Sequence, residues 1–237
     1  MREEFSRMGL LLGEEALSRL EGARVAVFGL GGVGGYTVEA LARAGIGHLD
    51  LIDSDTVSVS NRNRQILATR STLGLPKTEA AKRRVLDINE EAQVTPWELF
   101  YNAATADRND LSKYDYIVDA IDTVTAKLLL IQRAHEVGTP IISCMGTGNK
   151  LDPTAFQVAD ISKTAMCPLA RVMRKELRNR GVNHHTVLFS PEEPLTPASL
   201  EAPPPGRRSI PASVSWVPSV AGLMIAGHIV LDLTGRN

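Results

Sequence analysis

A glycine-rich turn near the amino terminus is the first pattern in this chain with a clear chemical use. Residues 29–35 read Gly-Leu-Gly-Gly-Val-Gly-Gly and follow the β-branched and aromatic run 24–28. A stretch with helical spacing comes next, and then the apolar run 48–52, which leads into Asp53. Amides at a helix start bind phosphate, and an acid after the second strand accepts a ribose hydroxyl. The pattern predicts a nucleotide site built from Gly29, Gly31, Gly32, Gly34 and Asp53.

Polar side chains follow two of the predicted strands, at the edge where open α/β sheets bind ligands. The loop after Asp53 is either a plain polar loop or a source of ligands for the nucleotide, and we predict the second. Its candidates are Asp55, Asn61, Arg64 and Gln65. Lys77 opens a predicted helix, where the helix dipole disfavours a cation unless an anion binds nearby. Asp122 ends another strand and is suited to hold Mg²⁺ on a triphosphate, to cap a helix starting at Thr123, or both.

These additional side chains favour ATP over a dinucleotide. The pyrophosphate of NAD carries two charges, and glycine amides with one helix dipole usually suffice to bind it. Asn61, Arg64 and Lys77, with a carboxylate for a metal, exceed that requirement and suit ATP with Mg²⁺. The chain also shows no evident acid or base for hydride transfer.

Strand and helix patterns alternate over the first 160 residues, which is typical of a mainly parallel sheet with helices on both faces. We expect an α/β fold with a Rossmann-like, doubly wound sheet, a C-terminal antiparallel extension and a closing helix. The chain would form one domain with a helical arm (1–20), a nucleotide-binding core (24–161) and a substrate-facing part (162–237). The strands are expected near 24–28, 48–53, 94–99, 114–122, 140–146, 156–161, 182–190 and 213–217.

A basic helix face and a proline-rich loop mark the C-terminal third. Four cations of the helix expected from Leu169 fall at i, i+3, i+4 and i+7 on one face, and a fifth lies just beyond. They are Arg171, Arg174, Lys175 and Arg178, followed by Arg180. Sequence alone allows either a solvated face or one that binds a phosphate backbone. Residues 191–211 hold seven prolines and are expected to form an exposed, mobile loop.

Composition restricts the remaining possibilities. The net charge of −1 argues against extensive nucleic-acid coating but allows a local basic patch. Two cysteines, Cys144 and Cys167, are too few for a disulfide framework, and a reducing cytoplasm is the expected location. The amino terminus lacks the apolar core of a signal peptide. Residues 217–233 are apolar but contain Pro218 and Asp232, so we expect a buried helix rather than a membrane anchor.

Four motifs in order make the chain similar to the ubiquitin-activating-enzyme-like adenylating family. They are G-x-G-G-V-G from Gly29, D-x-D-x-V-x-x-S-N-x-x-R-Q from Asp53, G-x-x-K at Lys77 and D-x-x-D at Asp122. The resemblance implies that Asp53, Asn61, Arg64, Lys77 and Asp122 contact ATP and its Mg²⁺. It also implies a homodimer in which Arg7, by pattern alone a solvated arginine, reaches the phosphates of the second subunit.

Within that family the chain resembles the tRNA threonylcarbamoyladenosine dehydratases. The matching segments are F-S-R-x-x-x-L-x-G (5–13), S-N-x-N-R-Q (60–65), M-G-x-G-N-K-L-D-P (145–153) and A-D-I-x-K-T…P-L-A-R-V-x-R-K-E-L (159–177). This branch implies an ATP-dependent cyclisation of the threonylcarbamoyl group on tRNA, so the basic face would contact tRNA. A sulfur-relay protein remains open as a further partner.

Two other functions stay open. An enzyme that adenylates the C-terminus of a small sulfur-carrier protein would share the ATP chemistry, although such enzymes usually have two C-x-x-C pairs and this chain has none. We expect Cys144 and Cys167 to be structural. The third hypothesis is a nucleotide-binding regulatory module that catalyses no reaction. The argument against it is the presence together of Arg7, Arg64, Lys77 and Asp122.

Overall fold

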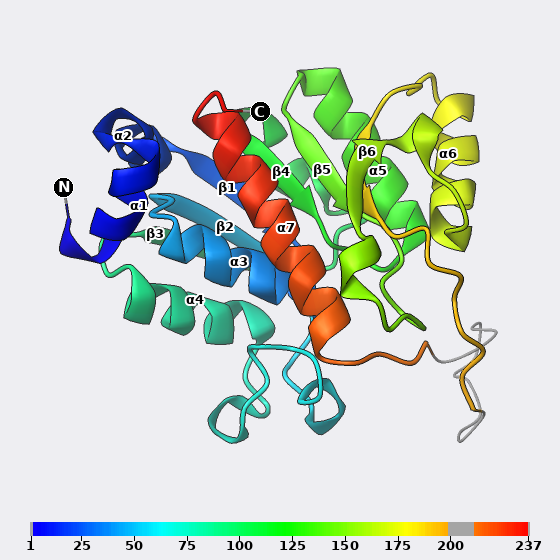
Figure 1. Ribbon diagram of the computed structural model, residues 1–237, viewed down its shortest axis with the longest axis horizontal. Helices are drawn as coiled ribbons and strands as arrows, with labels where there is room; N and C mark the ends of the chain where they lie inside the picture. Colours follow the sequence, from blue (N-terminus) through cyan, green and yellow to red (C-terminus); the bar gives the residue numbers. More distant parts are fainter. Residues whose placement is uncertain (1, 199–210, 237) are drawn as a thin grey trace.

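A seven-stranded sheet forms the centre of the computed structural model, which describes residues 2–198 and 211–236 (Figure 1). Its strand order is β3-β2-β1-β4-β5-β7-β6, and every neighbouring pair is parallel except β6 with β7. The strands are β1 (Arg24–Phe28), β2 (His48–Asp53), β3 (Gln93–Glu98), β4 (Tyr116–Asp119), β5 (Ile141–Cys144), β6 (Gln157–Asp160) and β7 (Thr186–Phe189). The mainly parallel sheet with an antiparallel C-terminal extension is confirmed.

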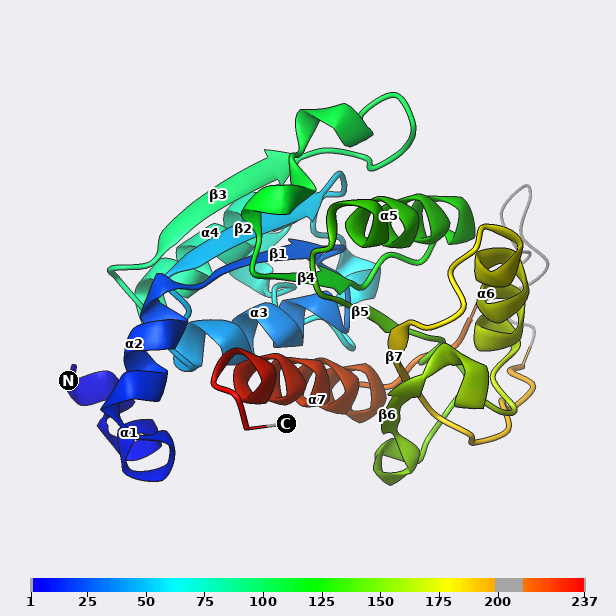
Figure 2. The ribbon, with the colours of Figure 1, turned by 90° about the horizontal axis from the view of Figure 1, so that it is seen from above.

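Helices cover both faces of this sheet (Figure 2). Helices α3, α4 and α7 pack on one face, and α5 and α6 lie on the other. The α-helices are α1 (Ser6–Leu12), α2 (Glu14–Gly22), α3 (Gly34–Arg43), α4 (Lys77–Ile88), α5 (Val124–Val137), α6 (Pro168–Asn179) and α7 (Trp216–Leu233). The short 3-10 helices are η1 (Glu3–Phe5), η2 (Val59–Asn61), η3 (Arg70–Thr72), η4 (Ala106–Arg108), η5 (Leu111–Lys113), η6 (Pro153–Ala155) and η7 (Ile161–Lys163).

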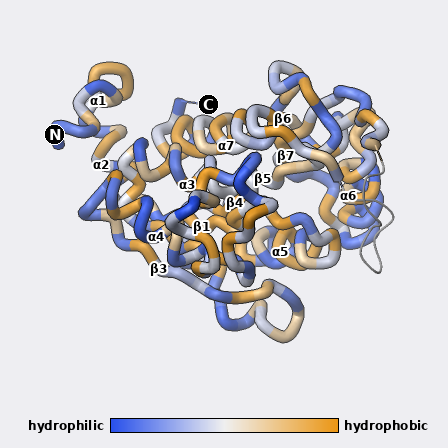
Figure 3. The backbone as a smooth tube through the Cα atoms, turned by 90° about the horizontal axis from the view of Figure 1, so that it is seen from below, coloured by the Kyte–Doolittle hydropathy of each residue, from blue (hydrophilic) through white to orange (hydrophobic). Residues whose placement is uncertain are grey.

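Strand β1 shows how the sequence divides the core into two. Val25 and Val27 face the cluster beneath α3, whereas Ala26 and Phe28 face the cluster beneath α5. All four are fully buried. Because successive strand residues point to opposite faces, a strand covered on both sides must be apolar throughout. In Figure 3 the hydrophobic segments accordingly concentrate in the central strands.

The C-terminal part differs from expectation at one element. The strand predicted at residues 213–217 is absent, because residues 211–215 are irregular and α7 begins at Trp216. Pro218 lies in the first turn of α7, where its missing N–H is not needed. Of the predicted loop 191–211, residues 191–198 and 211 form no helix or strand, and residues 199–210 lie outside the described part, so mobility stays a prediction.

Helix α7 is the one helix in the described residues that is long and apolar enough to cross a membrane. Here it packs along α3, and the two backbones approach closely at Gly222. A Cβ added at Gly222 would lie 2.4 Å from the Val33 carbonyl oxygen, and the Gly222 carbonyl accepts a hydrogen bond from Thr37 Oγ1. This close packing is that of the expected buried closing helix.

A buried polar layer lies between β5 and α5. His185 is 3% exposed, and its Nε2 lies 2.8 Å from Ser143 Oγ on β5. Its Nδ1 lies 3.4 Å from Nε2 of His135 on α5. Burial, followed by the neighbouring His135 and Lys127, lowers the pKa of His185 to about 3. The folded protein therefore holds this imidazole neutral.

Acid should destabilise the protein through His185. Below pH 6.5 the unfolded chain binds a proton at this imidazole that the folded chain excludes until about pH 3. The free energy of unfolding should therefore fall by about 1.4 kcal/mol per pH unit across this window from this group. Denaturant titrations at several pH values between 7 and 3.5 give the free energy of unfolding at each pH. This free energy should fall less steeply with decreasing pH in His185→Gln than in the wild type. His184→Gln, which changes an exposed neighbour, is the control, and equal slopes for the two variants would contradict the prediction.

Candidate nucleotide site

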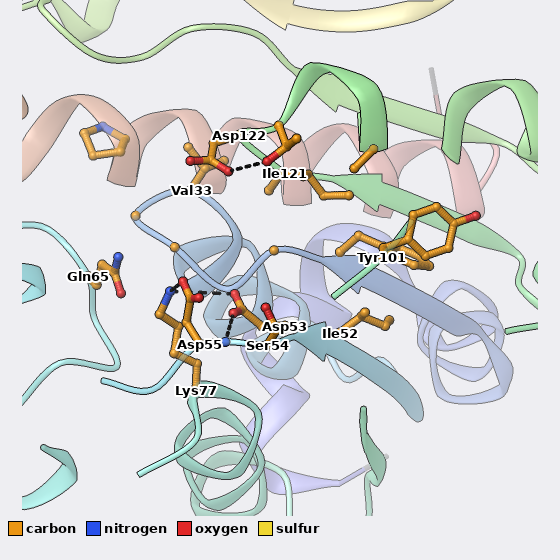
Figure 4. A pocket seen from close by; sticks show the side chains of 18 of the residues that line it. Val33, Ile52, Asp53, Ser54, Asp55, Gln65, Lys77, Tyr101, Ile121 and Asp122 are labelled. Carbon is orange, nitrogen blue, oxygen red and sulfur yellow. Dashed lines mark hydrogen bonds and ion pairs between the residues drawn. The ribbon is translucent and has the colours of Figure 1, made fainter. Parts of the chain in front are cut away.

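A pocket of about 470 Å³ lies beyond the carboxyl ends of β1, β2 and β4 (Figure 4). The strand order changes direction between β1 and β4, which is where doubly wound sheets form a crevice. Ten residues predicted to contact the nucleotide line this pocket. They are Gly29, Gly31, Gly32, Asp53, Asp55, Asn61, Arg64, Gln65, Lys77 and Asp122.

The glycine turn requires glycine for steric reasons. Gly29 has φ = +90°, and a Cβ there would lie 2.6 Å from the Ala120 carbonyl oxygen. A Cβ at Gly34 would lie 1.8 Å from the Gly29 carbonyl oxygen. Gly34 does not line the pocket but begins α3 behind it. Its position indicates a packing role, whereas Gly31 and Gly32 line the pocket.

Asp53 fastens the end of β2 to the glycine turn. Its Oδ2 accepts a hydrogen bond from the Leu30 amide at 2.6 Å, and its Oδ1 accepts one from the Asp55 amide at 2.8 Å. An ionised carboxylate accepts about four hydrogen bonds. Asp53 therefore shapes the pocket and retains capacity for a ligand hydroxyl.

Lys77 places a buried positive charge at the pocket wall. The residue is 5% exposed, and its Nζ lies 2.7 Å from Asp55 Oδ2 and 3.8 Å from Asp53 Oδ2. In Figure 4 its side chain points at these two carboxylates. The Lys77 amide also bonds the Asp55 carbonyl, and residues 56 and 76 form a β-bridge. The start of α4 is thus fixed against the end of β2.

Arg64 and Gln65 follow η2 and line the pocket beside the glycine turn. Figure 4 shows Gln65 on the side of the pocket opposite Tyr101. Arg64 Nη1 donates to the Ser60 carbonyl and to Asn63 Oδ1, both at 2.9 Å. A guanidinium has five N–H donors, so others remain for a ligand. Gln65 is 7% exposed, and its Oε1 has no hydrogen-bond partner among the described residues. Asn61 uses its Oδ1 to accept from the Ser58 amide.

Largely apolar side chains that we did not predict from the sequence form the end of the pocket opposite Gln65. Leu99, Phe100 and Tyr101 follow β3, and Phe100 remains 54% exposed. Tyr101 packs edge-to-face on Phe28, with ring centroids 5.0 Å apart. A flat apolar wall of this kind suits a nucleobase. The sequence shows only that these residues lie at the end of a predicted strand, whereas the pairing of that strand with β2, which brings them to the pocket, is seen only in the structure.

Asp122 lies across the pocket from Lys77, on the turn between β4 and α5 (Figure 4). The N-cap of α5 is Thr123, so the alternative role of Asp122 as the cap is wrong. Asp122 Oδ1 accepts from Thr123 Oγ1 at 3.3 Å. The described residues contain no cluster of three or more His, Cys, Asp or Glu side chains suited to a metal. A single carboxylate nevertheless fits Mg²⁺ that arrives on phosphates and keeps several waters.

Other predicted functional residues lie outside the pocket. Arg7 is exposed on α1, which lies at the edge of the sheet where the strands begin, whereas the pocket is at the edge where they end (Figure 1). On α6, Arg171, Lys175 and Arg178 are exposed.

Two cations of the α6 face are held by the protein itself. Arg174 Nη1 donates to the carbonyl and hydroxyl oxygens of Thr164, at 2.9 and 2.6 Å. Arg180 forms a 2.8 Å ion pair with Glu176 one turn earlier. Of the four exposed cations of this face, Arg180 is therefore ion-paired, which leaves Arg171, Lys175 and Arg178.

Neither cysteine lines the pocket. Cys144 on β5 and Cys167 before α6 are both buried and free. Burial raises the pKa of the Cys144 thiol to about 12. The thiolate form that acts as a nucleophile is therefore disfavoured at Cys144, which agrees with the structural role expected for this residue.

Comparisons with known proteins agree with this arrangement. The family model described as "ThiF family" matches residues 5–237. A protein of Bacillus subtilis (strain 168) named tRNA threonylcarbamoyladenosine dehydratase is 42% identical over 242 residues, which cover 98% of this chain and 95% of that protein. A protein of Escherichia coli (strain K12) with the same name is 40% identical over 178 residues, covering 75% of this chain and 66% of that protein.

Solved structures are similar over nearly the whole chain. The E. coli tRNA N6-threonylcarbamoyladenosine dehydratase, TcdA, has been solved in complex with ATP and in complex with AMP. Each has a TM-score of 0.89 and 33% identity, and the match covers 99% of this chain and 95% of TcdA. E. coli MccB, at 22% identity and a TM-score of 0.70, shares the fold.

Proposed function

The chain belongs to the ThiF family, and from this premise we propose that it is an ATP-dependent tRNA threonylcarbamoyladenosine dehydratase. The observation that carries the proposal is the convergence of Arg64, Lys77 and Asp122 on the glycine turn in one pocket. This set provides more phosphate-binding groups than a dinucleotide needs. The similarity to the Bacillus subtilis dehydratase along nearly both full lengths supports tRNA as the acceptor.

ATP would lie along the pocket with its two ends in different surroundings. The base would rest against Leu99 and Phe100, and Asp53 would accept a ribose hydroxyl. The phosphates would meet the glycine-turn amides, with Arg64 and Lys77 on either side. When bound, Mg²⁺ would be held by Asp122 together with phosphate oxygens and would neutralise phosphate charge.

The reaction follows from placing a carboxylate beside the α-phosphate. The free carboxylate of the threonylcarbamoyl group attacks the α-phosphorus, which gives an acyl-adenylate and releases pyrophosphate. The carbamoyl group of the same substituent then attacks the acyl carbon, loses a proton, closes a ring and expels AMP. Arg64 and Lys77 stabilise the charge that grows on the phosphates. No protein nucleophile is required, in agreement with the buried cysteines.

Product analysis tests the proposal directly. The purified chain is incubated with ATP, Mg²⁺ and threonylcarbamoylated tRNA, and AMP and pyrophosphate are measured. The nucleosides of the digested tRNA are weighed by mass spectrometry. We expect AMP release with tRNA and a nucleoside lighter by the mass of one water, and Lys77→Met should lose both. AMP release only with a sulfur-carrier protein would identify a carrier-activating enzyme, and no release with either would identify a binding module.

The exposed cations of α6 are proposed to bind the phosphate backbone of this tRNA. Arg171, Lys175 and Arg178 are spaced along one side of the helix and are open to solvent. Replacing all three by Ala should weaken tRNA binding and reduce the slope of log K against log salt by about 2–3. ATP affinity should stay unchanged. Filter binding at several salt concentrations measures both effects.

The matched control removes three exposed cations on other elements, Arg19, Arg83 and Lys113. Wild-type tRNA affinity is expected for this control. If it loses as much affinity and salt dependence as the α6 variant, the effect belongs to net charge and the α6 face has no special role.

We also propose that the enzyme is a homodimer in the cytoplasm, with Arg7 of the partner subunit acting at each pocket. Helix α1 supports an interface, because Leu10 and Leu11 are each 80% exposed and its apolar end projects from the body (Figure 3). Exposed leucines of this kind mark a binding surface when they are adjacent. Arg7 lies on the same helix and does not line the pocket of its own chain.

Mixing two inactive variants would test Arg7 in trans. Arg7→Ala and Lys77→Met should each lack AMP release when assayed alone. After the two are unfolded and refolded together, hybrid dimers should recover activity, because one of their two pockets combines an intact Lys77 with an intact Arg7 of the partner. Arg19→Ala mixed with Arg7→Ala is the positive control. Recovery in the control but none with Lys77→Met would show that Arg7 does not act across the interface.

A further inference from the structure

We propose that a buried ion pair, Lys127 with Asp119, is a positioning device that sets Asp122 for Mg²⁺–ATP; this inference rests on the proposed function. Both side chains are fully buried, and Lys127 Nζ lies 3.0 Å from Asp119 Oδ2. Neither residue lines the pocket. Asp119 ends β4, and Lys127 lies one turn into α5, so the pair spans the turn that carries Asp122.

The ammonium and the carboxylate hold this turn from both sides. Lys127 Nζ donates hydrogen bonds to the carbonyl oxygens of Ile121, at 3.0 Å, and of Asp119, at 3.4 Å. Its contact with Asp119 Oδ2 is an ion pair, and this oxygen has no hydrogen-bond partner among the described residues. Asp119 Oδ1 accepts from the Ile121 amide at 3.2 Å. Both backbone polar groups of Ile121, the residue before Asp122, are therefore bonded to the pair.

The same turn is fixed on its other side by the glycine turn. The Ala120 amide donates to the Phe28 carbonyl at 2.8 Å, and the Ala120 carbonyl lies where a Cβ on Gly29 would clash. Residues 120–123 all line the pocket. Because the turn is held between Gly29 and Lys127, a shift of the ammonium must move the pocket wall that carries Asp122.

Stability alone gives little reason for a pair in this place. Moving two charges out of water costs about as much free energy as their attraction contributes, and proteins with well-packed apolar replacements are often as stable. Groups that orient a metal ligand, in contrast, typically alter metal affinity about 10–100-fold when they are lost. The function that the geometry assigns to the pair is thus to place a ligand.

The test removes both charges together, in Lys127→Met/Asp119→Asn, so that neither is left buried alone. The readout is ATP affinity by calorimetry with and without Mg²⁺, which needs no acceptor. We expect the Mg²⁺ concentration for half-maximal enhancement of ATP binding to rise about tenfold or more. ATP affinity without Mg²⁺ and the melting temperature should remain close to those of the wild type.

Two comparisons make the result specific. Glu39→Gln/Arg84→Met removes an ion pair between α3 and α4 that does not line the pocket, and it should keep wild-type Mg²⁺ dependence. Lys127→Arg keeps the charge but displaces the donors, and it should give a smaller rise. Should the double variant fail to fold, Lys127→Arg decides: unchanged Mg²⁺ dependence overturns the proposal, and a rise absent from the α3–α4 control supports it.

Asp122→Asn separates this inference from the proposed function. If Asp122→Asn raises the Mg²⁺ requirement and adding the double substitution raises it no further, the pair acts through Asp122. If Asp122→Asn has the effect and the folded double variant has none, the positioning role is overturned and the role of Asp122 stands. If the double variant alone has the effect, the pair does not act through Asp122 and the proposal is overturned. A failure of tRNA turnover changes none of these binding results.

Discussion

The pocket depends on one close approach between two neighbouring strands. The ends of β1 and β4 lie so near each other that the Ala120 carbonyl occupies the place of a side chain on Gly29. This contact fixes the glycine turn relative to the turn that carries Asp122, and Asp53 fixes the same glycine turn to the end of β2. Three strand ends are therefore joined around one pocket before any ligand arrives, which is the preorganisation that charge stabilisation requires.

The electrostatics of the pocket agree with the polyanion that we propose binds there. Lys77 is buried, and in the described residues its charge is matched by Asp55 and, at longer range, by Asp53. The Asp55 side chain is largely exposed, so the ion pair of Lys77 with Asp55 lies at the protein surface. Breaking such a pair costs little free energy. Bound phosphates would replace a single carboxylate with several oxygens. Lys77 is thus held beside the proposed phosphate site, and it can exchange Asp55 for a phosphate oxygen.

Most of the pocket could be predicted because its parts are local in sequence. The glycine turn, Asp53 and Lys77 each sit at the end or start of a strongly patterned strand or helix, and strand ends meet at one edge of a parallel sheet. Phe100 could not be assigned in this way, because its proximity depends on β3 pairing with β2. The inward turn of Arg174 toward Thr164 depends on side-chain choices that helical spacing does not contain. The strand expected at 213–217 failed for a related reason. Short β-branched runs fit a strand or a helix start equally well, and the packing of α7 on α3 decides between them.

Different interactions support the two sides of the pocket, and they determine which substitutions each side tolerates. On the α3 side, the glycine turn rests on close backbone contact, and Gly222 lets α7 approach α3 behind it. A larger side chain has no room there, so steric fit determines which substitutions are tolerated. On the α5 side, the support is a polar layer in which Asp119 and Ser143 are register partners and Lys127 lowers the pKa of the nearby His185. Tolerance there is decided by charge, because removing one member leaves another buried without compensation. A single substitution that preserves volume should therefore be mild beneath α3, but beneath α5 it should be severe where it removes only one charge of the buried pair.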